Sequence, residues 1–151
     1  MRKTLITGTI IAFIFLWAIP TWADDSEIKI YLNNISEYKC IAMEVEGIEN
    51  YDGSDTRTIG ARQTELMRFY ATAWFLSATT YRWKIKLWSS DDTKSWDELA
   101  ELELTAQTMF ILWPTLLQFY ISKETIQNGE VSYNTSLNLT SDIGTLSINA
   151  R

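Results

Sequence analysis

The side chains that most often do chemistry in proteins are scarce in this chain. It contains no histidine and a single cysteine, Cys40. Without histidine it lacks the commonest general base and zinc ligand, and the usual catalytic triad cannot be built. The sequence also has no glycine-rich phosphate loop, nucleophile elbow or dinucleotide fingerprint. We therefore predict a non-enzymatic protein with no metal and no cofactor.

Carboxylates are the exception, because acidic residues crowd one stretch of the chain. They are Asp91, Asp92, Asp97, Glu98, Glu101 and Glu103. Two carboxylates are enough to hydrolyse a glycosidic bond when one donates a proton and the other attacks or activates water. The same residues equally suit a solvated turn followed by an acidic strand face. A carboxylate-dependent hydrolase is therefore kept as an alternative, and no catalytic residue is named.

A strictly alternating stretch, TYRWKIKLWS from Thr80 to Ser89, presents a row of basic residues. Successive side chains of a strand leave opposite faces of the sheet, so one set faces the core and the other faces outward. The outward set is Arg82, Lys84, Lys86 and Trp88. This row suits an anionic ligand or anionic membrane headgroups. It also suits cross-strand pairing with Glu101 and Glu103, which we favour.

Two tryptophans complete the candidate binding site. Trp88 lies on the outward side of the alternating stretch, and Trp96 follows a polar turn. Exposed tryptophans stack on sugar rings, enter lipid interfaces or anchor protein partners. The alternative is that both rings fold back over the edge of the core. The candidate binding residues are Arg82, Lys84, Lys86, Trp88 and Trp96.

The charge and the cysteine limit the partners. The chain has 19 acidic and 13 basic residues, a net charge of -6. An acidic surface does not favour nucleic acid, so we predict no nucleic-acid partner. Cys40 has no second cysteine to pair with, so it is either buried as a small apolar residue or bonded to another chain.

The first 23 residues follow the pattern of a secretory signal. Arg2 and Lys3 precede an apolar run from Ile10 to Ile19, and the small Ala23 precedes two aspartates. The run is shorter than the roughly 20 apolar residues that span a bilayer as a helix. We therefore expect a signal peptide at residues 1–23, a single domain at residues 24–151, and a secreted or periplasmic location.

Alternation recurs along the rest of the chain. Strands are expected at 27–33, 38–46, 80–89, 116–125, 131–140 and 145–150. Residues 47–60 are the most polar stretch and are predicted to form a loop with a turn at Asp52-Gly53. Asn128-Gly129 is the clearest hairpin turn.

Two stretches fit both helix and strand. Residues 60–76 favour a strand from Thr64 onward, with a hairpin turn at 77–79 into the alternating stretch. Ser95 and Glu98 have the spacing of a helix capping box, whereas Glu101 to Leu104 alternates as a strand does. A short helical turn followed by a strand is the compromise.

The sequence thus predicts an all-β fold, a single antiparallel β-sandwich or small barrel of about seven to nine strands. One short helix near residues 95–106 stays open. The function that we expect is a binding module that contacts a glycan, a lipid surface or a protein through its aromatic and basic face or nearby loops. A membrane-active, toxin-like β-protein that inserts residues 64–87 as a hairpin is a further alternative.

Overall fold

The structure is a computed structural model that describes residues 23–109, 116–127, 129–138 and 143–151. These residues form nine β-strands and no helix. The strands are β1 (Ala23–Asn34), β2 (Cys40–Glu49), β3 (Ser54–Ile59), β4 (Thr64–Trp74), β5 (Thr79–Ser90), β6 (Asp97–Met109), β7 (Leu116–Ile126), β8 (Val131–Asn138) and β9 (Ile143–Ala150). Residues 1–22 of the predicted signal peptide and Asn128 of the predicted turn lie outside the described residues.

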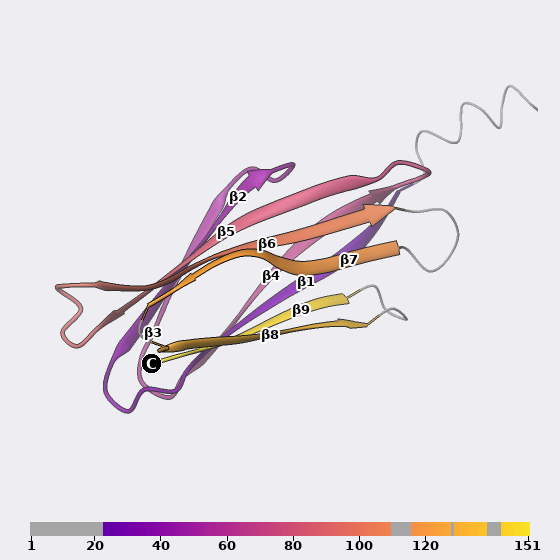
Figure 1. Cartoon of the computed structure of the whole chain (residues 1–151). Coiled ribbons are helices and arrows are strands. Elements are labelled where there is room, and N and C mark those ends of the chain that lie inside the picture. Colours follow the sequence, from indigo (N-terminus) through magenta and orange to yellow (C-terminus); the bar gives the residue numbers. More distant parts are fainter. Residues whose placement is uncertain (1–22, 110–115, 128, 139–142) are drawn as a thin grey trace, which may run out of the picture.

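The strands form two sheets that pack face to face as a β-sandwich (Figure 1). One sheet has four strands in the order β4-β1-β9-β8, and the other has five in the order β3-β2-β5-β6-β7. The predicted fold class is therefore confirmed. One pair departs from the antiparallel expectation, because β1 and β9 run parallel. β1 and β9 both run from the same end of the sandwich to the other, so their pairing is parallel.

The alternating pattern places one face of each sheet in the core. Trp83 in the middle of β5 is fully buried and contacts Tyr51 and Phe69, with ring centroids 5.8 and 6.1 Å away. Ile28 and Ile30 of β1 are also fully buried. Burying a large apolar side chain contributes about 1.5–3 kcal/mol, so these inward rows supply most of the force that holds the sheets together.

The short helix that the sequence left open near residues 95–106 does not form, because β6 is a strand from Asp97 onward. Ser95 and Glu98 do not cap a helix; Glu98 pairs with Trp88 of β5 in the sheet register. β6 lies between β5 and β7, which satisfy its backbone groups on both sides. Leu102 and Leu104 are fully buried. The strand-like alternation from Glu101 to Leu104 therefore predicted the local structure correctly, and the capping-box spacing of Ser95 and Glu98 did not.

The strand predicted from Thr64 is confirmed as β4, but the hairpin predicted between β4 and β5 is wrong. β4 pairs with β1 in the four-stranded sheet, whereas β5 pairs with β2 and β6 in the other. Their connection therefore crosses between the sheets, and only Trp74 and Ser77 form a bridge at the turn. The expected loop at 47–60 also contains the edge strand β3, whose partner is β2.

Gly47 stands at an irregularity of β2, where the register with β5 shifts. Its backbone amide donates to the carbonyl of Gly53 at 2.9 Å. A Cβ atom at Gly47 would lie 2.1 Å from the carbonyl oxygen of Tyr51. Only glycine therefore fits here without moving the backbone that carries Tyr51 to the core.

We expect Gly47→Ala to lower the free energy of unfolding by about 1–3 kcal/mol, the usual range for forced overpacking. Urea unfolding followed by tryptophan fluorescence measures the change. Gly60→Ala is the matched control, because a Cβ there would first meet the flexible side-chain oxygen of Gln63 at 3.3 Å. Equal losses in the two variants would contradict this account.

Candidate functional site

The outer face of the five-stranded sheet carries charged residues in columns of alternating sign. The basic residues of β5 form the central column, with glutamates of β2 on one side and of β6 on the other. Lys84 lies in register between Glu46 and Glu103. Lys86 lies in the same way between Glu44 and Glu101. The predicted pairing of the basic strand β5 with the acidic strand β6 is therefore confirmed. The second acidic column, on β2, was not predicted from the sequence.

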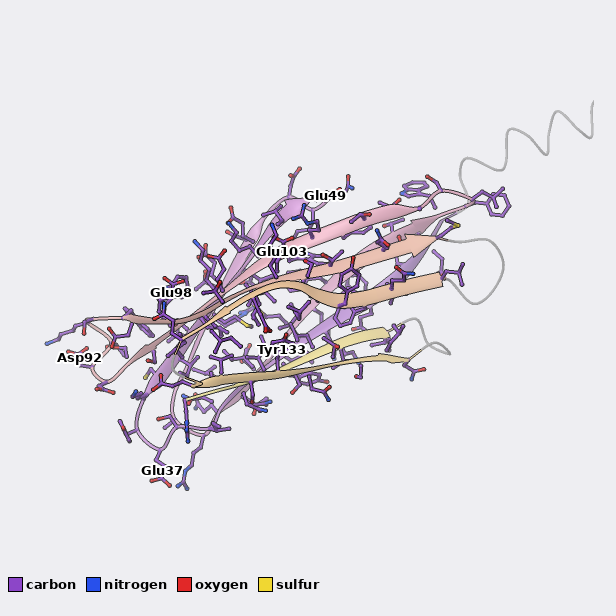
Figure 2. All side chains as sticks on the ribbon, in the orientation of Figure 1. Glu37, Glu49, Asp92, Glu98, Glu103 and Tyr133 are labelled. Carbon is purple, nitrogen blue, oxygen red and sulfur yellow. The ribbon has the colours of Figure 1, made fainter. Side chains whose placement is uncertain are left out.

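Arg82, at one end of the basic column, forms the closest ion pair of this arrangement with Glu103. The Nε atom of Arg82 donates to Oε1 of Glu103 at 2.9 Å, and its Nη2 atom donates to the same oxygen. Nη1 of Arg82 lies 3.4 Å from Oε2 of Glu49. Figure 2 labels both carboxylates along the five-stranded sheet. Arg82 is thus shared between the two acidic columns.

A bulge in β7 adds to the surroundings of Glu103. The register between β6 and β7 shifts after Glu103, and Ser122 is the additional residue. Its hydroxyl lies 3.2 Å from Oε1 of Glu103 and 2.8 Å from the hydroxyl of Thr105. Nζ of Lys123 is 3.6 Å from Oε2 of Glu103. The carboxylate is thereby satisfied although only 8% of the residue is exposed.

The pKa of Glu103 lies below its ordinary value, first because of the hydrogen bonds from Arg82, which outweigh the opposing effect of burial. The same hydrogen bonds raise the pKa of Arg82. Both groups are therefore held in their charged forms. Within the part of the chain that the structure describes, Lys84 and Lys86 make no ion pair within 4.0 Å, so their ammonium groups face glutamates without direct contact.

The depressed pKa of Glu103 predicts a pH-dependent contribution to stability. This contribution is complete above the ordinary carboxyl pKa of 4.5 and is lost as pH falls through the lower folded value. We expect Glu103→Gln to have a lower urea midpoint than the native protein at pH 7, and the difference to shrink below pH 4.5.

Urea unfolding across this pH range measures the effect. Glu101→Gln is the control, because Glu101 lies on the same face of β6 and makes no ion pair within 4.0 Å among the described residues. It should change the midpoint little at any pH. A deficit of Glu103→Gln that persists unchanged in acid would refute the electrostatic explanation.

The second feature of this face is a hollow of about 380 Å³ that Trp88 and Trp96 line together. Ala42 of β2 and the edge-strand threonines Thr56 and Thr58 complete it. Trp88 is half-buried in β5 opposite Ala42, and Trp96 is 37% exposed. The structure therefore brings the two predicted tryptophans to one concave surface. Sequence reasoning missed the threonines because it assigned their strand to a loop.

Asp92 shapes the turn that leads to Trp96. Its Oδ1 atom accepts hydrogen bonds from the backbone amides of Lys94 and Ser95 at 2.9 and 3.1 Å. These bonds, that of Lys94 first, lower the pKa of Asp92, so it stays ionised. The hydroxyl of Ser90 accepts from the amide of Thr93 at 2.8 Å. Figure 2 shows Asp92 at the end of this projecting turn. Asp92 is thus a positioning residue for Trp96.

The charged residues nearest to the hollow come from the neighbouring positions of the same strands. Lys86 precedes Trp88 by two residues on the same face of β5, and its partner in β2 is Glu44. Glu98 pairs with Trp88 from the side of β6. The site therefore combines two indole rings and two hydroxyls with charged groups of both signs at its border.

The six carboxylates considered for catalysis show no pair with the properties of a general acid and a base. A general acid needs a raised pKa, whereas those of Asp92 and Glu103 are lowered.

Cys40 is half-buried on β2 opposite Ser90. Among the described residues, no three potential histidine, cysteine or carboxylate ligands gather around one point.

The described part of the chain contains no helix with the length and apolarity needed to cross a membrane. No protein-family model matches the chain, and none of the curated proteins matches it.

Proposed function

We propose that this protein is a secreted or periplasmic binding module without catalytic activity, and that it binds a carbohydrate in the hollow between Trp88 and Trp96. The observation that carries the proposal is the convergence of two accessible indole rings on one concave surface. The faces of a sugar ring carry C–H groups, which pack on the electron-rich face of an indole ring. Hydroxyl groups around the sugar ring need hydrogen-bond partners at the same time.

The polar groups around the rings fit this second requirement. Thr56 and Thr58 offer hydroxyls within the hollow, each able to donate and accept. Lys86, Glu44 and Glu98 stand at its border in the sheet register. A volume of about 380 Å³ is at the lower end of small-molecule sites, which supports a ligand of one or two sugar units.

The other ligand classes fit this face less well. Its centre carries closely spaced charges of both signs, which are costly to place against lipid. Arg82 already contacts two carboxylates, so a large anion would have to displace Glu49 or Glu103. A small, mostly uncharged and hydroxyl-rich ligand avoids both costs because it needs only the hollow.

We expect Trp88→Ala and Trp96→Ala each to weaken carbohydrate binding about tenfold or more, in line with the 1–3 kcal/mol typical of a lost aromatic stack. A glycan array identifies the ligand, and isothermal titration calorimetry measures the affinity. Trp74→Ala is the matched control, because Trp74 is 44% exposed but ends β4 in the four-stranded sheet, away from the hollow. A blank array, or equal losses in all three variants, would refute the proposal.

The proposed location has its own test. Expression with a carboxyl-terminal tag in a host that exports proteins should yield a chain that begins at Asp24, because Ala23 completes the signal pattern. Intact-mass spectrometry of the medium and envelope fractions reads the amino terminus. Recovery of only the full-length chain from the cytoplasm would contradict a secreted or periplasmic location.

A further inference from the structure

One end of the sandwich exposes a group of apolar side chains, which we call the apolar tip. It is formed by the β4–β5 turn together with the adjacent ends of β6 and β7. Its members are Trp74, Leu76, Ala78, Met109 and Leu116. Trp74 is 44% exposed, Leu76 62% and Leu116 56%. Ala78 lines a small hollow with Met109 and Leu116, which shows that the turn lies beside these strand ends.

The strands that lead to the apolar tip carry no charge over their last residues. No charged residue occurs between Arg68 and Arg82, or between Glu103 and Lys123. The polar residues Gln107, Thr108 and Gln118 that line the small hollow beside Met109 and Leu116 are uncharged. The opposite end differs, because its turns carry residues such as Glu37, Lys39, Arg62, Asp91, Asp92, Lys94 and Glu130. Charge is thus concentrated away from the tip.

Among the described residues, the acidic residues nearest to the tip are Asp24 and Asp25, at the start of β1. In the register of β1 and β4, Asp25 lies opposite Thr72. Its Oδ1 atom accepts a hydrogen bond from the Thr72 hydroxyl at 2.8 Å. Asp24 and Asp25 thus lie opposite the residues that come one and two positions before Trp74. A surface that meets this end should therefore be neutral or zwitterionic, since an anionic one would be repelled.

Leu76 has a backbone conformation that does not suit it. Its φ angle is +54°, in the left-handed region that glycine and asparagine adopt at lower cost. A large apolar residue that is both exposed and strained is not explained by folding stability. Strain of this kind is often found where a residue serves function.

The position of β1 connects this end to the sequence before it. Ala23 pairs with Trp74, so the described chain begins beside the apolar tip. The apolar run from Ile10 to Ile19 precedes Ala23 in the sequence. The carboxyl terminus lies at the opposite end of the sandwich (Figure 1). The amino-terminal end of the described chain is therefore the end that carries the apolar tip.

We propose that the apolar tip docks into the interfacial region of a lipid bilayer, with Trp74 and Leu76 as anchors. Tryptophan favours the headgroup level, and an aliphatic side chain beside it reaches the acyl boundary.

Docking in this way orients the proposed carbohydrate site. Trp88 lies near the far end of β5, whose first residue, Thr79, follows the tip. At about 3.3 Å per strand residue, Trp88 is held about 30 Å from the tip. The hollow would therefore lie beyond the headgroups, where it is accessible to ligands in solution. The docking proposal does not depend on carbohydrate binding.

Flotation with phosphatidylcholine vesicles tests the proposal on the secreted protein, with a tag at the carboxyl terminus. We expect the native protein to float with the vesicles, and Trp74→Ser combined with Leu76→Asn to reduce the bound fraction about tenfold. Asparagine tolerates the backbone conformation of Leu76, so Leu76→Asn alone should keep or raise the thermal unfolding temperature while it weakens binding. This variant separates docking from folding.

Ile35→Ser with Tyr38→Ser is the matched control, because these residues are 54% and 72% exposed at the opposite end. It should bind vesicles as the native protein does. Absent binding by the native protein, or full binding by the tip variants, would overturn the proposal. So would binding that requires phosphatidylglycerol and disappears in salt, or a self-association that the tip variants abolish in ultracentrifugation.

Discussion

The rest of this structure depends on the pairing of β5 between β2 and β6. Because side chains alternate along a strand, one choice of register decides both faces of the sheet at once. The inward row of β5, with Trp83 at its centre, closes the core against the four-stranded sheet. The outward row places Arg82 between Glu49 and Glu103. A slip of one residue would bury the charges and expose the rings, so core and surface specify the same register.

The charged columns and the aromatic hollow are two parts of one sheet face with different physical character. Around Arg82 the side chains satisfy one another, which makes that region stable and unavailable to a ligand without displacement. Around Trp88 the neighbouring strand supplies only the small Ala42, and this leaves room above the ring. The turn held by Asp92 then brings Trp96 to the other side of that space.

The two ends of the sandwich differ in a comparable way. The end that holds the turns after β1, β3, β5 and β7 is rich in charge, whereas the β4–β5 turn is apolar and strained. The difference could not be seen as a surface in the sequence, because Trp74 is 35 positions away from Met109 along the chain. It results from the fold, which places the β4–β5 turn beside the ends of β6 and β7.

The sequence by itself determined the all-β class, the strands with clean alternation and the identity of the outward row on β5. Period-two patterning is local, so it survives without knowledge of neighbours. It did not determine the state of residues 95–106, because Ser95 and Glu98 satisfy helix capping locally while pairing on both sides favours a strand. Only the tertiary structure decided that β4 and β5 belong to different sheets, that β2 brings a second acidic column, and that Thr56 and Thr58 join Trp88 and Trp96. Each depends on which strands become neighbours, and strand pairing is set by contacts between residues distant in the chain.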